Sequence, residues 1–192
     1  MPSDSIRTFI ALEINEEIKE KIENVQSTIK LTNSIKGSWV KKENLHLTLK
    51  FLGDTQIKHI EEIKGKIKES FKDESSINCS LSGVGIFPNA RSPRVIWVGI
   101  KNGAVEIINL ASNLETTLSQ LGFKKEKRDF KTHITICRPK QILGQQKLQN
   151  ALEEINKQFS PQEFVINKIT FLESKLTSQG SIYTPILSYQ LK

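Results

Sequence analysis

The chain has 192 residues, 37% of them hydrophobic and 26% charged, which is an ordinary composition for a folded globular protein and argues against a disordered one. No apolar run approaches the roughly 18 residues of a membrane span, and the first residues lack a secretion-signal pattern, so we expect a cytoplasmic protein that makes no membrane contact. The net charge of +7 and the pI near 9.4 favour an anionic partner. Two cysteines, Cys79 and Cys137, are too few for a disulfide framework and are expected to be buried thiols.

The first half of the chain alternates strand and helix patterns. In chain order these are a strand at 6–14, a helix following Asn15, a strand at 46–51, a helix at 57–71 and a strand at 77–87. The strands are rich in β-branched and apolar residues or alternate between apolar and polar ones. The helices carry apolar residues at intervals of three and four, and Asn15 and Thr55 precede them as N-caps.

The second half repeats this order. It consists of a strand at 94–100, a helix at 103–121, a strand at 133–137, a helix at 144–159 and strands at 164–174 and 182–191. Because the element order matches, we predict one bilobal α+β domain, 1–192, built from two repeats related by an approximate twofold axis. The repeats span roughly 5–88 and 93–174, and the strand at 182–191 completes a sheet. Each lobe is expected to hold an antiparallel sheet and two helices, with the active-site cleft between the lobes.

Two matching tetrapeptides lie in equivalent strands, "HLTL" beginning at His46 and "HITI" beginning at His133. Side chains two apart on a strand point to the same face, so His46 shares a face with Thr48, and His133 shares one with Thr135. A single strand histidine is more often a core or surface residue. Here two of the three histidines carry threonine at the same offset, which favours a shared function, and the third, His59, has no such partner.

Two histidines that face one cleft suit a reaction in which one proton is removed and another is delivered. The pKa of an unperturbed imidazole is about 6.5, so one ring can act as base while the other, still protonated, acts as acid. The hydroxyl groups of Thr48 and Thr135 can donate to the non-bridging oxygens of a phosphodiester. A metal site is the competing interpretation. Zinc usually takes three or four protein ligands, and neither tetrapeptide places Cys, Asp or Glu at ligand spacing, so we expect neither a metal nor another cofactor.

A basic run leads into the second histidine strand. Six basic residues lie between Lys124 and Arg138, against only two acidic ones. The run is either a solvated loop or a binding site for phosphates. For the second interpretation we single out Arg138 and Arg128 as phosphate ligands. Phe51 and Phe130 are candidates for stacking on a base, with core packing as the alternative for both rings.

The two tetrapeptides, the opening "RTFIALEI", the stretch "FPNARSPRVIWVGI" and the closing "ITFLESKL" together resemble the two-histidine phosphoesterase superfamily and its HxTx motif. Within it the chain looks like the RNA 2′,3′-cyclic phosphodiesterases, also called 2′-5′ RNA ligases, over nearly its whole length. The resemblance implies metal-independent hydrolysis of a terminal 2′,3′-cyclic phosphate on RNA to a 2′-phosphate. It also implies His46 as proton donor, His133 as proton acceptor, and Thr48 and Thr135 as phosphate ligands. Arg138 matches a basic position of the family.

The expected partner is RNA that ends in a 2′,3′-cyclic phosphate, tRNA fragments included, and we expect a monomer. If an RNA 5′-hydroxyl replaced water as the nucleophile, the same site would form a 2′-5′ linkage in a reversible ligation. Two other functions stay open. A cyclic phosphodiesterase that acts on a small nucleotide or a 2′-5′ oligonucleotide would keep both tetrapeptides, whereas a non-catalytic RNA-binding module would bind RNA without turnover.

Overall fold

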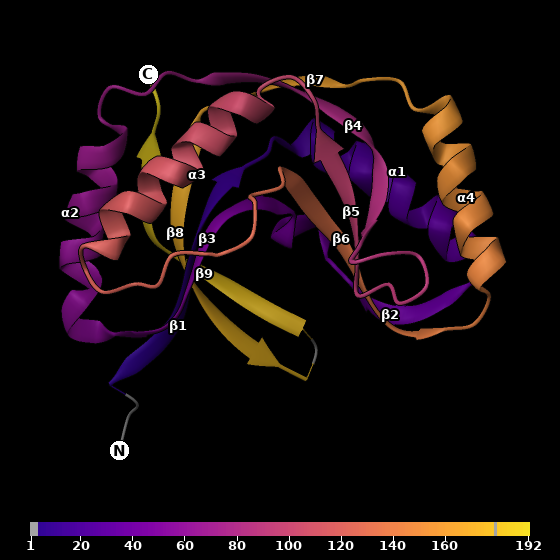
Figure 1. The fold of residues 1–192 in the computed structure, drawn as a ribbon, viewed down its shortest axis with the longest axis horizontal. Helices are drawn as coiled ribbons and strands as arrows, with labels where there is room; N and C mark the ends of the chain where they lie inside the picture. Colours follow the sequence, from indigo (N-terminus) through magenta and orange to yellow (C-terminus); the bar gives the residue numbers. More distant parts are fainter. Residues whose placement is uncertain (1–3, 179) are drawn as a thin grey trace.

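The computed structural model describes residues 4–178 and 180–192, and within them the chain forms nine strands, four helices and two short 3₁₀ turns (Figure 1). The strands are β1 (Ser5–Glu13), β2 (Ile35–Trp39), β3 (His46–Gln56), β4 (Ile77–Phe87), β5 (Val95–Ile100), β6 (His133–Ile142), β7 (Glu163–Ile166), β8 (Lys168–Thr177) and β9 (Gly180–Gln190). The helices are α1 (Glu16–Leu31), α2 (Ile60–Phe71), α3 (Ala104–Ser119) and α4 (Gln145–Gln158), and the 3₁₀ turns are η1 (Lys42–Asn44) and η2 (Ile57–His59).

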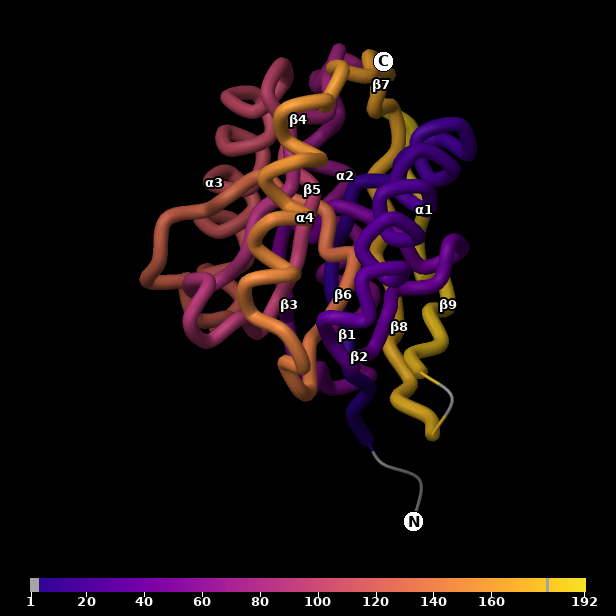
Figure 2. The backbone as a smooth tube through the Cα atoms, turned by 90° about the vertical axis from the view of Figure 1, so that its right-hand side faces the viewer, coloured from indigo at the N-terminus to yellow at the C-terminus, as the bar shows by residue number. Residues whose placement is uncertain are grey.

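The strands form one curled antiparallel sheet in the order β7-β4-β5-β6-β3-β1-β8-β9, and β2 pairs with β6 beside this path. We call β3, β1, β8 and β9 with α2 and α3 the β3 lobe, and β6, β5, β4, β7 and β2 with α1 and α4 the β6 lobe. Helix α3 packs against α2 and β3 (Figure 1), whereas α1 packs against α4 and β6 (Figure 2). The predicted bilobal α+β architecture, with an antiparallel sheet and two helices in each lobe, is confirmed.

The two lobes do not coincide with the two halves of the sequence. Elements β2, β4 and α1 come from the first half but belong to the β6 lobe, and β8, β9 and α3 come from the second half but belong to the β3 lobe. Each half therefore crosses between the lobes. The strand order β8-β1-β3 in one lobe matches β4-β5-β6 in the other, as an approximate twofold requires. The repeat boundaries of roughly 5–88 and 93–174 stay a prediction.

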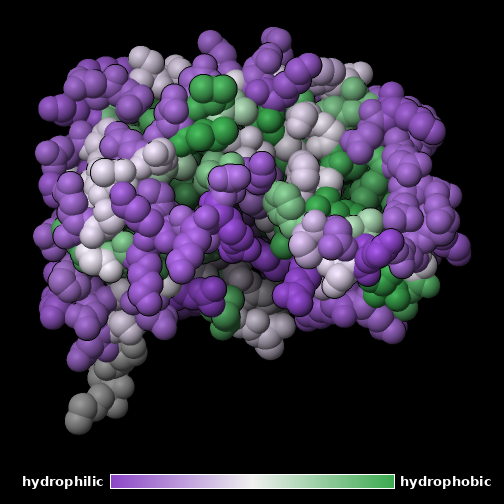
Figure 3. All heavy atoms as spheres, in the orientation of Figure 1, coloured by the Kyte–Doolittle hydropathy of each residue, from purple (hydrophilic) through white to green (hydrophobic). Residues whose placement is uncertain are grey.

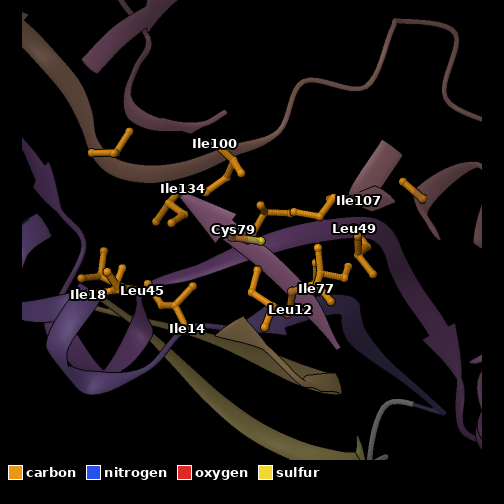
Figure 4. Close-up of a cluster of buried hydrophobic side chains, with 14 of the residues drawn as sticks. Leu12, Ile14, Ile18, Leu45, Leu49, Ile77, Cys79, Ile100, Ile107 and Ile134 are labelled. Atoms are coloured by element: carbon orange, nitrogen blue, oxygen red, sulfur yellow. The ribbon is translucent and has the colours of Figure 1, made fainter. Parts of the chain in front are cut away.

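A continuous hydrophobic core runs across the junction between the lobes. Figure 4 shows Leu12 of β1 in the same cluster as Ile134 of β6, and both side chains are fully buried. Cys79 and Cys137 are buried as free thiols, as predicted. Because apolar burial stabilises by about 25 cal/mol per Å², this shared core holds the two lobes as one unit.

Strands β3 and β6 meet at a single backbone pair, in which Leu47 lies opposite Ile134. Both side chains are fully buried. Beyond this pair, β6 pairs with β2 instead of β3, and Trp39 of β2 lies opposite Cys137 of β6. The sheets of the two lobes therefore diverge from one point of contact.

Two features of the sequence hold β2 against β6. At Gly37 a Cβ would lie 2.7 Å from the carbonyl oxygen of Arg138, so any side chain there would push the strands apart. The buried amide of Gln26 in α1 donates to the carbonyl oxygens of Val40 and Ile136, both at 2.8 Å. Strand β2 was not predicted, because a pattern of five residues is too short to stand out by periodicity.

A β-bulge in β3 breaks the alternation that a regular strand over 46–51 would show. Two consecutive residues of β1 lie opposite Thr48 and Lys50, so Leu49 is an extra residue on β3. The bulge turns Lys50 away from the face that carries Thr48 and brings Phe51 onto that face. Phe51 accordingly lines the same cavity as Thr48.

The side chain of Lys50 is buried on the helix-covered face. Its ammonium group donates to Glu115 of α3 at 2.6 Å and to the carbonyl oxygen of Lys124 at 3.0 Å. The same carboxylate oxygen of Glu115 accepts from the backbone N–H of Glu126 at 3.3 Å. A buried charge needs such partners, and here they anchor the start of residues 124–131, which we call the basic segment.

The predicted capping role of Thr55 is wrong. Thr55 lies within β3, and its buried hydroxyl shares a hydrogen bond with the hydroxyl of Thr8 in β1 at 2.7 Å. A hydroxyl that finds a partner across the sheet extends the strand, and α2 begins only at Ile60. Asn15 caps α1 as predicted, since its side chain accepts from the N–H of Ile18 at 2.9 Å.

Hydrophilic side chains dominate the face shown in Figure 3, in keeping with the large charged fraction of the sequence. The exposed large hydrophobic residues include Leu176 and Ile182 in the β8–β9 hairpin. In the part of the chain that the structure describes, no helix combines the length and the apolar character needed to cross a membrane.

Candidate active site

A cleft of about 840 Å³ opens where the two lobes meet, and it holds both histidine motifs. The predicted site residues that line it are His46, Thr48, Phe51, His133, Thr135 and Arg138. Six of the eight residues predicted for the site therefore lie around one space, although they come from two strands of different lobes.

The single backbone pair between β3 and β6 brings the two motifs together. In an antiparallel pair the flanking residues run in opposite directions, so His46 lies on the side of Thr135, and Thr48 lies on the side of His133. The paired residues themselves point into the core. Because side chains alternate along a strand, all four motif side chains point to the opposite face, which forms the floor of the cleft.

Both histidine rings are held by the same kind of hydrogen bond. Nδ1 of His46 lies 2.7 Å from the carbonyl oxygen of Asn44, and Nδ1 of His133 lies 2.7 Å from that of Lys131. A carbonyl oxygen only accepts, so Nδ1 carries the hydrogen and donates in both rings. A neutral ring then presents an unprotonated Nε2, as a general base requires, and a charged ring presents an Nε2–H, as a general acid requires.

Nε2 of His46 has a further partner within its own motif, because it lies 3.0 Å from Oγ1 of Thr48. The hydroxyl donates to the neutral ring and accepts from the charged one, so it can serve both states. No equivalent bond joins His133 to Thr135 among the described residues. The two half-sites thus share the hydrogen bond from Nδ1 to a backbone carbonyl, but they differ at Nε2, where only His46 contacts its threonine among the described residues.

Burial lowers the pKa of His46 to about 4; the hydrogen bond to Asn44 opposes this shift, and the charges of Arg138 and His133 add to it. Burial likewise lowers the pKa of His133, against the hydrogen bond to Lys131 and with the charge of Arg138. Both rings are therefore mostly neutral at pH 7 in the free protein. An anion in the cleft would raise both pKa values.

Aromatic rings pack against each imidazole. His46 contacts Phe9 and Tyr183, with ring centroids 5.0 and 5.4 Å away. His133 contacts Phe87 at 5.1 Å and Trp97 at 6.4 Å. These rings restrict the rotation of the imidazoles and help to bury them.

Positive charge surrounds the histidines. Arg138 of β6, Arg7 of β1 and Lys41, which precedes η1, line the cleft, and no Asp or Glu is among its described lining residues. Nor are three His, Cys, Asp or Glu side chains grouped to hold a metal ion anywhere in residues 4–178 and 180–192. The cleft as it stands suits an anionic ligand.

Two predicted ligands lie outside this cleft. Arg128 is exposed in the basic segment, where its guanidinium pairs with Glu126 at 3.4 Å. Phe130 is partly buried and packs against the hydrophobic core, so the core-packing alternative holds for this ring. Phe51, by contrast, is 59% exposed within the cleft.

One wall of the cleft was not predicted from the sequence. It is the outer part of the β8–β9 hairpin, whose lining residues are Ser174, Leu176, Thr177, Ser178, Gly180, Ser181 and Tyr183. Nothing local marks these residues, because long-range pairing of β8 with β1 brings the hairpin to the site. Arg7 was also missed, although its alternation with the buried Thr8 and Ile10 was a usable signal.

Comparisons with known proteins show what the chain and its fold are similar to. The family model described as "LigT like Phosphoesterase" matches twice, at residues 12–97 and 98–183. The chain is 34% identical to the RNA 2′,3′-cyclic phosphodiesterase of Aquifex aeolicus over 97% of each protein, and 38% identical to that of Methanocaldococcus jannaschii over 94% of this chain and 98% of the relative. The solved structure of TT0787 from Thermus thermophilus shares the fold, with a TM-score of 0.80 at 23% identity over 97% of this chain and 98% of that one.

The lowered pKa of His46 predicts a pH-dependent stability. Below the unfolded-state pKa of about 6.5, His46 binds a proton in the unfolded chain but not in the folded one. The free energy of unfolding therefore decreases as the pH is lowered, until the folded-state pKa of about 4 is reached. We expect His46→Gln to remove this contribution, which is at most about 1.4 kcal/mol per pH unit between those limits. Urea denaturation of both proteins at about pH 7 and about pH 5 measures the difference.

The matched control is His59→Gln, because His59 lies at η2, outside the cleft, with its side chain 42% exposed. An unchanged pH dependence in His46→Gln would contradict the burial of a neutral ring, and so would an equal change in the control.

Proposed function

Since the chain belongs to the LigT-like phosphoesterase family, we propose that it hydrolyses the 2′,3′-cyclic phosphodiester at the end of an RNA to a 2′-phosphomonoester. The observation that carries the proposal is the cleft in which two histidines, each held at Nδ1, and two threonines surround one space. The activity after which the Aquifex and Methanocaldococcus relatives are named supports the choice of substrate. The cationic lining supports an anionic ligand.

In the proposed reaction, Nε2 of neutral His133 takes a proton from water while the water oxygen attacks phosphorus in line with the 3′ oxygen. The new P–O bond forms as the bond from phosphorus to the 3′ oxygen breaks. Nε2–H of charged His46 gives its proton to the departing oxygen, and the phosphate stays on the 2′ oxygen. His133 leaves the step charged and His46 neutral, and proton exchange with solvent resets the pair.

The charge that develops on the phosphate needs donors of its own. The hydroxyl groups of Thr48 and Thr135 each lie two residues after a histidine on the same strand face, which suits donation to the two non-bridging oxygens. The guanidinium of Arg138, which lines the same cleft, supplies positive charge beside them.

The donor role of His46 depends on the charge of the substrate. With a pKa of about 4, this ring is neutral at pH 7 in the free protein. A bound phosphodiester anion favours the charged ring, and the hydroxyl of Thr48, 3.0 Å from Nε2, can accept from it. We therefore propose that His46 takes up its proton as the substrate binds.

An RNA 5′-hydroxyl that replaced water would lose its proton to His133 in the same way and would form a 2′-5′ linkage. Hydrolysis is expected to prevail unless a second strand is held in the cleft, because water is abundant. Both steps move only protons and the phosphoryl group between groups already named, so we propose that the activity persists in EDTA.

Two further contacts with RNA are proposed. Phe51, exposed in the cleft with its ring centroid 5.8 Å from that of Phe9, would stack on a base. The basic segment, Arg128 included, would contact phosphates beyond the reacting one. Its basic side chains are exposed, and the buried ion pair of Lys50 with Glu115 anchors its start.

We expect kcat, which reports the pKa values of the enzyme–substrate complex, to depend on pH as a bell, and each histidine variant to lose one side of it. His133→Ala removes the base and therefore the acidic side, whereas His46→Ala removes the acid and therefore the alkaline side. Each change should lower kcat/KM by roughly 10² to 10⁴ fold. Initial rates on an RNA oligonucleotide with a terminal 2′,3′-cyclic phosphate, measured from about pH 4 to about pH 9, give the profiles.

His59→Ala serves as the control and should leave the bell intact. Near-normal turnover in either cleft variant would refute the two-histidine mechanism. If each variant lost the opposite side of the bell, the two-histidine mechanism would stand, with His46 as the base and His133 as the acid.

Removing three charges of the basic segment, with Lys125→Ala, Lys127→Ala and Arg128→Ala combined, should weaken binding of a long RNA and flatten its salt dependence. Each lost phosphate contact on single-stranded RNA lowers the slope of log K against log salt by about 0.7, or roughly 2 for three contacts. Hydrolysis of a mononucleotide 2′,3′-cyclic phosphate should be unchanged, because it does not reach the segment.

A control with the same net charge carries Lys21→Ala, Lys147→Ala and Lys157→Ala, all exposed on α1 and α4. If the slope of log K against log salt falls equally in both triple variants, the effect is one of net charge and the proposed contact is wrong.

A further inference from the structure

The two half-sites differ in what holds the carbonyl group that fixes each histidine. The carbonyl oxygens of Asn44 and Lys131 accept from Nδ1 of His46 and His133 at the same distance, 2.7 Å. The side-chain amide of Asn44 also donates to the carbonyl oxygen of Ser181 at 2.8 Å, in a partly buried contact. The side chain of Lys131 is exposed and makes no such bridge in the described part of the chain.

Ser181 lies in β9, near the outer end of the β8–β9 hairpin that walls the cleft. The hairpin reaches His46 by a second route, because the ring of Tyr183 contacts the imidazole edge-on at 5.4 Å. Figure 1 shows this hairpin extending away from the body of the molecule. Leu176 and Ile182 are 68% and 56% exposed, so the outer hairpin is packed only lightly.

We propose that Asn44 is a positioning residue that couples the β8–β9 hairpin to His46. A nucleotide that contacts the cleft-facing side of the hairpin then orients the imidazole through the Ser181–Asn44–His46 chain of hydrogen bonds. Among the residues that the structure describes, His133 has no such connection, so only the His46 half-site senses this wall of the cleft. The inference rests on the proposed function, in which His46 moves a proton.

The physical reason lies in the geometry of the two bonds. A hydrogen bond weakens steeply when its acceptor leaves the donor direction, so a displaced Asn44 carbonyl frees the ring to turn and lets the hydrogen move from Nδ1 to Nε2. The Nε2–H tautomer takes up its proton at Nδ1 instead, and the charged ring that results lacks the carbonyl acceptor that directs its Nε2–H toward the departing oxygen. An anchored Asn44 thus favours the tautomer that can become charged at Nε2 when substrate binds.

Two variants test the bridge. Asn44→Asp keeps the size of the side chain but removes the donor to Ser181, and Asn44→Ala removes the side chain. We expect kcat on the cyclic-phosphate RNA to fall about tenfold in both, the effect of one lost hydrogen bond, with a smaller change in KM. In Asn44→Asp the added carboxylate should also raise the pKa of His46, which moves the pH profile upward.

The control is Asn113→Ala, because Asn113 of α3 likewise donates its amide to a serine carbonyl, that of Ser70, at 3.4 Å, but lies outside the cleft. Its kcat should match that of the unsubstituted protein. Circular dichroism confirms that each variant is folded, and the isosteric Asn44→Asp decides the question if Asn44→Ala is not.

A readout that does not need activity is the ¹⁵N NMR spectrum of the histidine rings. In both Asn44 variants we expect His46 to populate two tautomers while His133 keeps one. An unchanged His46 tautomer with kcat within twofold of the unsubstituted protein overturns the proposal, and so does an equal disturbance of both rings. If the unsubstituted protein showed no turnover, the proposed function would fail while the spectrum would still decide the coupling.

Discussion

One antiparallel backbone pair, Leu47 with Ile134, is the contact on which the site depends. It joins the two halves of the curled sheet, which diverge elsewhere, and the cleft opens where they meet. Because both residues are buried, alternation points their neighbours to the open side, and antiparallel register places each histidine beside the threonine of the other strand. The interleaving of the lobes stabilises this arrangement. Helix α1 follows β1 of the β3 lobe but packs on the β6 lobe, and α3 follows β5 of the β6 lobe but packs on the β3 lobe.

The electrostatics of the cleft follow from the same burial. Aromatic rings and the sheet withdraw the imidazoles from water, which disfavours their charge, while Arg138 in the same space disfavours it further. The hydrogen on each Nδ1 is fixed by a backbone carbonyl, so the only change left to the rings is protonation at Nε2. In the free protein, therefore, both rings favour the neutral state. Negative charge on a ligand in the cleft would favour the protonated, positively charged rings.

Much of this could be predicted from the sequence, because the decisive signals are local. Element order and the two His-x-Thr pairs sufficed for the bilobal α+β fold and for the four residues on the cleft floor. What could not be predicted depends on long-range contacts. The bulge at Leu49, which carries Phe51 into the cleft, follows from pairing with β1, and the hairpin wall from pairing of β8 with β1. For Phe130 the sequence left stacking and core packing open, because an aromatic residue in a basic run has the same local pattern whether its ring packs inward or outward.

The central claim is that imidazoles from the two lobes act on one phosphorus atom. The most direct measurement is a single turnover of RNA ending in a 2′,3′-cyclic phosphate by EDTA-treated protein in H₂¹⁸O, with the product analysed by mass spectrometry and ³¹P NMR. The account predicts a 2′-phosphate that carries one ¹⁸O atom. A 3′-phosphate, an unlabelled product or no turnover would contradict it.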